Sequence, residues 1–308
     1  MSEKVYIFGH KNPDTDSICS SLVEEILDKK NGWNDVQAKR LGNINKETQY
    51  VLNYLGIEPP ELLERVEENQ EVLLVDHNDF VESVDGIEKA KILGVTDHHK
   101  IANFRTVEPL YYTAKPYGCT CTIFYEEFKR LGHKIDKKEA ILMLSAIISD
   151  TLLLKSPTTT EHDKIALEEL GKIADIDVNT YGLEMLKAGT DLSDFSEEEL
   201  INLDSKLKVT DNFKYVVAQV NAVSINDVLK REEKLKEEIL KSIKENKLDM
   251  FILLITDILN SNSEAIVLGN RSDVAEKAFE KTLNNNRTFL EGVVSRKKQV
   301  IPVIEKSI

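Results

Sequence analysis

Short apolar runs alternate with stretches of helical periodicity through the first two thirds of the chain. Runs rich in β-forming residues predict strands at 5–8, 36–41, 71–75, 91–96 and 107–113. Apolar residues spaced three and four positions apart predict helices at 18–27, 46–55, 137–149, 161–174 and 178–187, and another that ends near 131. Apolar strands that alternate with helices are typical of a mainly parallel sheet covered by helices, so we expect an α/β fold here.

The small, polar stretch at 188–194 is the best candidate for a linker. We therefore expect a first domain at 1–188, a linker at 189–194 and a second domain at 195–308. Strands predicted at 206–210, 213–220, 250–256 and 265–268, with a charged helix at 226–246, favour a smaller mixed α/β domain. That helix pairs Glu232 with Lys236 and Lys234 with Glu238 at four-residue spacing, which predicts a solvated face.

Three of the predicted strands are followed by side chains of the types that bind metal ions. The first strand is followed by His10, Asp14 and Asp16, the strand at 71–75 by Asp76, and the strand at 91–96 by Asp97, His98 and His99. Because ligands bind beyond the carboxyl ends of the strands in open α/β sheets, the three strand ends are expected to bring His10, Asp76 and His98 into one crevice. A single aspartate could instead cap a helix. His77 is expected to point away from Asp76 if the strand continues.

Two further charged features stand out. Asp150 ends the apolar helix at 137–149, where a carboxylate meets the negative end of the helix dipole and costs up to about 1 kcal/mol unless a cation offsets it. We therefore predict that Asp150 is a metal ligand. The basic run from Arg296 to Lys298 is unusual in an acidic chain, and its pattern fits a solvated segment and an anion site equally well.

Composition excludes several classes of protein. The net charge of −14 argues against a nucleic-acid partner, which needs a basic face. The 3 cysteines are too few for a disulfide framework, so reduced, buried thiols without chemistry of their own are expected. No apolar stretch is long enough to span a membrane and no apolar leader is visible, so we expect a cytoplasmic protein.

Five motifs together resemble those of a known family. They are His10-Lys11-Asn12-Pro13-Asp14-Thr15-Asp16-Ser17, Val75-Asp76-His77-Asn78, Asp97-His98-His99, Ser145-Ala146-Ile147-Ile148-Ser149-Asp150 and Ser295-Arg296-Lys297-Lys298-Gln299. The whole chain resembles the family II inorganic pyrophosphatases, the manganese- or cobalt-dependent soluble enzymes of the DHH phosphoesterase superfamily. The resemblance implies an N-terminal DHH domain, a smaller C-terminal domain and an active site in the cleft between them. It also implies hydrolysis of pyrophosphate to two phosphates, by attack of a water or hydroxide that bridges two metal ions.

The resemblance assigns roles to individual residues. One ion would be held by His10, Asp14 and Asp76, and the other by Asp16, Asp76, His98 and Asp150. Pyrophosphate would be bound by His99, Lys206, Arg296 and Lys297, with His99 also assisting proton transfer. The implied ions are two Mn²⁺, which Co²⁺ can replace, with additional Mg²⁺ arriving with the substrate. A homodimer through the N-terminal domain is implied as well.

Two other functions compete with this interpretation. Related phosphodiesterases and exopolyphosphatases carry a similar metal constellation, but the nucleic-acid-directed ones generally add a glycine-rich motif that ends in histidine. This chain has no Gly-Gly pair and no histidine after His162. A non-catalytic metal-sensing module would be expected to have lost a ligand or a substrate cation, and none is missing.

Overall fold

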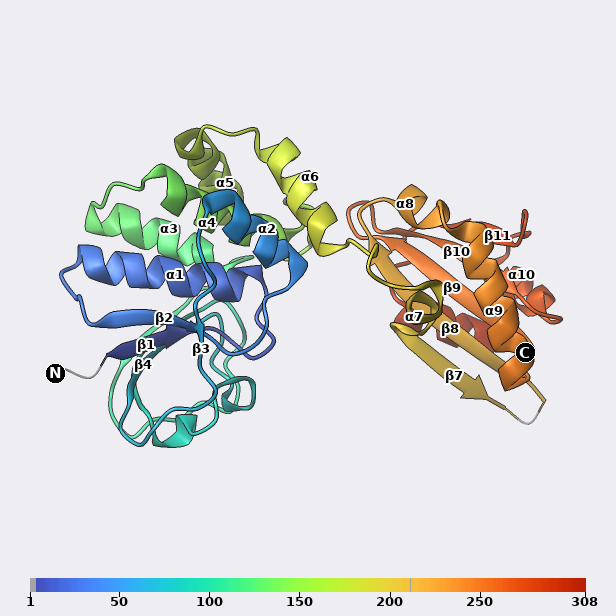
Figure 1. The fold of residues 1–308 in the computed structure, drawn as a ribbon, viewed down its shortest axis with the longest axis horizontal. Helices are drawn as coiled ribbons and strands as arrows, with labels where there is room; N and C mark the ends of the chain where they lie inside the picture. Colours follow the sequence, from blue (N-terminus) through green and yellow to red (C-terminus); the bar gives the residue numbers. More distant parts are fainter. Residues whose placement is uncertain (1–3, 211) are drawn as a thin grey trace. The chain divides into compact units, whose positions relative to one another are not determined.

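The computed structural model describes residues 4–210 and 212–308. The chain divides into two compact units, the first ending at Gly189 and the second starting at Thr190. Figure 1 shows the strands and helices of each unit, and the two units are described separately below.

The first unit is built on a sheet of six parallel strands in the order β3-β2-β1-β4-β5-β6. The strands are β1 (Val5–Phe8), β2 (Val36–Arg40), β3 (Glu61–Leu62), β4 (Glu71–Val75), β5 (Lys91–Asp97) and β6 (Tyr111–Ala114). The chain builds outward from β1 in one direction and from β4 in the other. The carboxyl ends of β1 and β4 therefore form the switch point, where parallel sheets bind ligands.

Helices cover one face of this sheet (Figure 1). The strands contact α1 (Thr15–Lys30) and α3 (Thr120–Leu131), and α4 (Lys137–Thr151) packs against these two helices. The remaining helices, α2 (Lys46–Leu55), α5 (Glu161–Ala174) and α6 (Val178–Gly189), pack against this group of three. On the other face, loops and the short 3-10 turns η1 (Phe80–Glu82) and η2 (Ile87–Lys89) cover an apolar cluster that includes Phe8 and Leu74. The predicted parallel sheet with helices is confirmed.

The end of α4 differs from the prediction. The helix continues beyond Ser149 to Thr151 and is followed by Leu152, Leu153 and Leu154, all three with left-handed backbones. Leucine has no preference for this conformation, which costs about 1–2 kcal/mol per residue. Nothing in the sequence pattern could therefore mark this stop.

The second unit has a five-stranded mixed sheet in the order β11-β10-β9-β8-β7, in which only β8 and β9 run parallel. Its strands are β7 (Ser205–Val209), β8 (Lys214–Ala222), β9 (Met250–Asp257), β10 (Asn262–Leu268) and β11 (Arg287–Leu290). One face packs on α7 (Glu197–Asn202), α8 (Ile225–Leu229) and α9 (Glu232–Asn246), and the other on α10 (Ser272–Phe279) and α11 (Ile301–Glu305). Alternate residues of β9 enter the two cores, so this strand is apolar from Met250 to Ile255.

The predicted helix at 226–246 is two helices, because the chain breaks at Arg231. The guanidinium group of Arg231 binds Glu197 and the carbonyl oxygen atoms of Leu192 and Phe195. Lys236 does pair with Glu232, at 2.7 Å, but its side chain is only 10% exposed. The prediction of a solvated face is wrong for this pair because α9 packs against β9 and β10.

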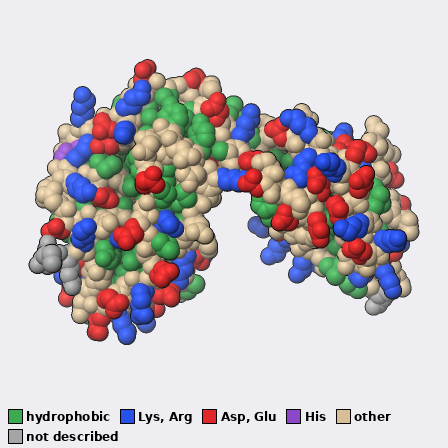
Figure 2. All heavy atoms as spheres, viewed as in Figure 1, with side chains coloured by type: hydrophobic (Ala, Val, Ile, Leu, Met, Phe, Trp, Pro, Cys, Tyr) green, Lys and Arg blue, Asp and Glu red, His purple; other side chains and the backbone are tan. Residues whose placement is uncertain are grey.

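The distribution of surface charge and the burial of the cysteine side chains agree with the composition. Figure 2 shows basic and acidic side chains interspersed on the viewed face of each unit, without a continuous basic stripe. The three cysteines are free and buried, as predicted. Among the residues that the structure describes, no helix combines the length and apolarity that a membrane crossing requires.

Candidate metal centre

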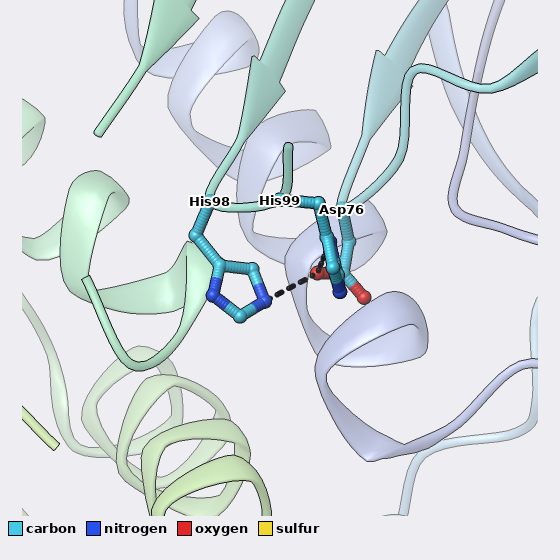
Figure 3. Close-up of side chains that lie close together, drawn as sticks. All are labelled: Asp76, His98 and His99. Atoms are coloured by element: carbon cyan, nitrogen blue, oxygen red, sulfur yellow. Dashed lines mark ion pairs between the residues drawn. The ribbon is translucent and has the colours of Figure 1, made fainter. Parts of the chain in front are cut away.

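The six predicted ligands converge at the switch point of the first unit. His10 follows β1, Asp14 caps α1 and Asp16 lies in its first turn, Asp76 follows β4, His98 follows β5, and Asp150 lies in the last turn of α4. In Figure 3, His98 and His99 leave the end of one strand and direct their rings toward Asp76 at the end of its neighbour. Parallel pairing of β1, β4 and β5 brings these loops together.

The ligands form two overlapping groups. His10, Asp14 and Asp76 make up one group, and Asp16, Asp76, His98 and Asp150 the other, with potential ligand atoms within 4.8 Å of one another in each group. Asp76 is common to both. The structure thus brings together the residues of both predicted ligand sets, while their binding of metal remains a prediction.

Both histidines are oriented by their Nδ1 atoms. Nδ1 of His10 lies 2.8 Å from the carbonyl oxygen of Lys11, and Nδ1 of His98 lies 3.0 Å from that of Tyr117. Each Nδ1 therefore carries the proton and donates it. Nε2 of His10 is left 3.5 Å from Asp14 and Asp76, and Nε2 of His98 is 3.5 Å from Asp76. Histidine ligands of metal ions are commonly oriented in this way.

Asp76 has the features of a bridging ligand. Its backbone is left-handed, with φ of 58°, and its side chain is 1% exposed. Oδ1 accepts a hydrogen bond from the hydroxyl of Thr120 at 2.9 Å. Oδ2 is buried and accepts no hydrogen bond, and Nε2 of His10 lies 3.5 Å from it. A buried carboxylate oxygen without a partner is costly, and a cation at this position would offset that cost.

Asp16 is held by the start of α3. Its carboxylate accepts hydrogen bonds from the backbone N–H of Thr120 at 2.6 Å and of Cys121 at 3.3 Å, and from the hydroxyl of Ser20 at 2.7 Å. The positive end of a helix dipole favours this carboxylate in its charged form. The contacts of Thr120 with the ligands could not be predicted, because the only signal of Thr120 in the sequence is its position at the start of a predicted helix.

The electrostatics of the centre favour binding of cations. Burial raises the pKa of Asp150 well above its ordinary value, and the neighbouring carboxylate of Asp16 raises it further. Burial also raises the pKa of Asp16, to about 6. Burial alone would lower the pKa of His10 and His98, but nearby carboxylates raise these values to about 11 and about 9. Without a metal, the centre therefore holds protons that a divalent cation would displace.

His99 lies beside the ligands, with its Nδ1 3.8 Å from Oδ1 of Asp76 and its ring centroid 4.1 Å from that of His98. Its Nδ1 lies 2.9 Å from Oδ1 of Asp97 and its side chain is 50% exposed. Asp97 raises the pKa of His99 by this hydrogen bond. Asp97 is in turn fixed by the side-chain amide of Asn78 at 2.5 Å. Asp97 and Asn78 both lie within the quoted motifs, but their role in orienting His99 could not be predicted from the sequence.

His77 takes no part in the centre. Its ring is buried and contacts the carbonyl oxygen of Val75 and the hydroxyl of Ser83, at 2.9 and 3.0 Å. Burial lowers its pKa to about 4, so the ring is neutral at pH 7. The expectation that His77 points away from Asp76 agrees with these contacts.

The predicted substrate cations belong to the second unit. Lys206 is exposed on β7, and Arg296 and Lys297 open the π-helical turn η3 (Arg296–Val300). Arg296 forms a bidentate ion pair with Asp204, and its backbone N–H donates to the side-chain carbonyl of Gln219 at 3.0 Å. Asp204 immediately precedes β7, so this ion pair connects η3 to the strand of Lys206.

Comparisons with known proteins agree on the architecture. The chain matches the model of the DHH family, N-terminal domain, over residues 4–147 and that of the DHHA2 domain over residues 183–307. It is 52% identical over 303 residues to the manganese-dependent inorganic pyrophosphatase of Bacillus subtilis, with 98% of each chain covered. A structure from Methanococcus jannaschii, assigned to the family II inorganic pyrophosphatases, has 40% identity and a TM-score of 0.62 with 98% of both chains covered. An exopolyphosphatase-related protein of Bacteroides fragilis, at 15% identity and a TM-score of 0.51 over 99% of this chain and 91% of that one, shares the fold alone.

Proposed function

The chain belongs to the family II inorganic pyrophosphatases, and we propose that it hydrolyses pyrophosphate to two phosphate ions at the carboxylate and histidine centre of its first unit. The observation that carries this proposal is the convergence of the two ligand groups on Asp76. Its unpartnered Oδ2 supports a cation there. Residues 1–188 would hold the metal ions and residues 195–308, beyond a linker at 189–194, would bind the phosphate groups.

The donor set fits manganese. Two imidazole nitrogens beside four carboxylates suit a borderline cation such as Mn²⁺ or Co²⁺ better than Mg²⁺, which prefers oxygen ligands and water. We propose that His10, Asp14 and Asp76 hold one Mn²⁺ and that Asp16, Asp76, His98 and Asp150 hold a second, with Co²⁺ able to replace both. When bound, the two ions supply Lewis acidity that lowers the pKa of a shared water and polarises phosphoryl oxygens.

The charges at the site explain why further cations are needed. The four carboxylates of the centre balance two divalent ions, so pyrophosphate would bring an uncompensated negative charge. Lys206, Arg296 and Lys297 would supply positive charge, and the guanidinium of Arg296, which is paired with Asp204 in this structure, has donors that match a phosphate group. Additional Mg²⁺ arriving with the substrate would neutralise the remainder.

His99 is suited to contact the leaving phosphate. Asp97 holds the proton on Nδ1, which leaves Nε2 as the ring nitrogen for substrate. The hydrogen bond to Asp97 also raises the pKa of this ring. A half-exposed imidazolium can donate to a phosphate oxygen and pass its proton to the leaving group.

Two remaining proposals come from the family alone. We propose a homodimer that assembles through the first unit, and a cytoplasmic location. Size-exclusion chromatography with light scattering would test the first, and a mass of one 35.0 kDa chain would contradict it.

Phosphate release from pyrophosphate by the chelator-stripped full chain would test the function. Restoring Mn²⁺ or Co²⁺ in the presence of Mg²⁺ should restore fast hydrolysis, and tripolyphosphate and a dinucleotide should be cleaved far more slowly. Hydrolysis of either alternative without hydrolysis of pyrophosphate would keep the metal centre and overturn the substrate. No hydrolysis of any of the three would favour a non-catalytic metal-binding protein.

Asp76→Asn would test the bridging role. Asparagine tolerates the left-handed backbone at this position, so the variant removes charge with little strain. We expect Mn²⁺ binding to weaken by at least about 100-fold, since even the loss of an outer partner of a metal ligand costs about 10–100-fold. Asp79→Asn, on the same loop, is the matched control and should bind Mn²⁺ normally. Unchanged affinity and turnover in Asp76→Asn would exclude a bridging Asp76.

A further inference from the structure

We propose that Asp163 of α5 is a positioning residue for the metal centre, because it fixes the segment 117–120 that orients three candidate ligands. This inference rests on the proposed metal centre but does not depend on the substrate. Asp163 is 0% exposed, and none of its hydrogen bonds in the described parts of the chain goes to a candidate ligand. Its effect on the centre would therefore be indirect.

The segment 117–120 makes three contacts with the ligands. The carbonyl oxygen of Tyr117 lies 3.0 Å from Nδ1 of His98 and so aims its Nε2 at the centre. The backbone N–H of Thr120 donates to Asp16 at 2.6 Å, and the hydroxyl of Thr120 donates to Asp76 at 2.9 Å. A displacement of this short segment would change the orientation of all three ligands together.

Asp163 binds this segment at Gly118 and the adjoining first turn of α3 at Thr122. Its Oδ2 accepts a hydrogen bond from the backbone N–H of Gly118 at 2.9 Å, and its Oδ1 accepts one from the hydroxyl of Thr122 at 2.6 Å. Hydrogen bonds to a charged carboxylate are roughly twice as strong as those between neutral groups. Because the group is buried, no water competes for these donors.

The packing around Gly118 leaves the segment little room. A Cβ atom at this position would lie 2.8 Å from Oδ2 of Asp163 and 2.9 Å from Cγ2 of Thr151. Thr151 follows Asp150, a fourth candidate ligand, at the end of α4. The glycine therefore lies tightly between Asp163 and the helix end that carries Asp150.

A simpler role for Asp163 is to cap its own helix. Together with Thr160 it forms a capping box at the start of α5, in which Oδ2 also accepts from the backbone N–H and the hydroxyl of Thr160. Capping needs only these bonds, whereas the bond from Gly118 holds the segment and the bond from Thr122 holds the first turn of α3, which follows it. Variants that remove these two sets of hydrogen bonds separately distinguish capping of α5 from positioning of the segment.

The test compares Asp163→Asn with Thr160→Val in the full chain. The asparagine variant replaces one accepting oxygen of Asp163 with an amide N–H₂, which the hydroxyl of Thr122 can accept but the backbone N–H of Gly118 cannot, so the bonds that remain are made to a neutral group. Thr160→Val instead removes the hydroxyl of the cap and keeps the carboxylate. We expect Asp163→Asn to bind Mn²⁺ about 10–100-fold more weakly, as measured by titration of chelator-stripped protein against a competing chelator. The visible absorption of the Co²⁺-loaded protein, which reports ligand geometry, should change as well. Thr160→Val should lose stability in urea but keep its Mn²⁺ affinity within about twofold.

Gly118→Ala provides a second route if Asp163→Asn fails to fold. Its methyl group would push the segment away from Asp163 without altering the cap, and the same loss of Mn²⁺ affinity is expected. Parental Mn²⁺ affinity in Gly118→Ala, or an equal loss in Thr160→Val and Asp163→Asn, would overturn the proposal. An unmodified chain that binds Mn²⁺ but does not hydrolyse pyrophosphate would contradict only the proposed function, and one that binds neither Mn²⁺ nor Co²⁺ would overturn both.

Discussion

At the scale of single residues, Asp76 combines a position that follows a buried strand with a left-handed backbone and contacts from two other elements. Its position after a buried strand predicts a place in the crevice, and the structure places it there. Its left-handed backbone and unpartnered oxygen could not be predicted, because both depend on contacts with β5 and α3. The supporting residues Thr120, Asn78 and Asp163 give no periodic signal either. Sequence reasoning therefore identified candidate ligands but not the residues that orient them.

Arg296→Ala should reduce kcat/KM for pyrophosphate by about 10–150-fold, since a hydrogen bond to a charged group contributes about 1.5–3 kcal/mol. Steady-state phosphate release with Mn²⁺ and Mg²⁺ measures this effect. Unchanged KM and kcat would remove Arg296 from the proposed substrate site.

Two controls separate phosphate binding from other effects of this change. Lys298→Ala removes a neighbouring exposed cation of the same basic run and should stay within about twofold of the parent. Asp204→Ala breaks the ion pair but keeps the guanidinium group, so it should reduce kcat/KM less than Arg296→Ala does. An equal effect of Asp204→Ala would indicate that the ion pair, rather than phosphate contact, is what matters.

Among the elements, strands and helices with strong periodicity were predicted well. Helices α2 and α5 begin and end where the pattern predicts, and β4 does as well. The break at Arg231 was missed because its cause is a set of contacts with residues far away in the sequence. The short strand β11 was missed because half of its four residues are not buried, so it lacks an apolar run.

Protonation of Glu24 in α1 should make the folded protein more stable at lower pH. Burial, together with the negative charge of Asp28 one turn away, raises the pKa of Glu24 to about 8. An unfolded glutamate has a pKa of about 4.3, so between the two values the folded state holds more protons and stability falls as pH rises. Glu24→Gln should therefore stabilise the protein at pH 8.5, and this advantage should shrink toward pH 5.

Urea denaturation across this pH range would measure the effect. Glu58→Gln, at an exposed position, is the control and should show no such trend. A Glu24→Gln variant that is less stable than the parent at every pH would show that this carboxylate is charged and favourably paired in the folded protein.

At the scale of the whole molecule, all six candidate ligands lie in the first unit, on four separate elements and loops. Metal binding should therefore stabilise one unit selectively. One ion at about 100 times its Kd adds about 2.7 kcal/mol, which raises the Tm of a unit of this size by about 5–11 °C.

Differential scanning calorimetry of the chelator-stripped full chain, with and without Mn²⁺, would test this. Two transitions are expected, of which only one moves on addition of metal. Unfolding in a single transition that shifts as a whole would show instead that the two units unfold cooperatively.

The buried thiols have a practical consequence. Burial raises the pKa values of Cys19, Cys119 and Cys121, so maleimide dyes should leave the native chain unlabelled. One added cysteine in each unit, such as Glu68→Cys and Lys241→Cys at exposed positions, would then carry a donor and an acceptor dye without further substitutions. Energy transfer between them would report directly on whether pyrophosphate moves the two units, in a background that keeps every native residue of the metal centre.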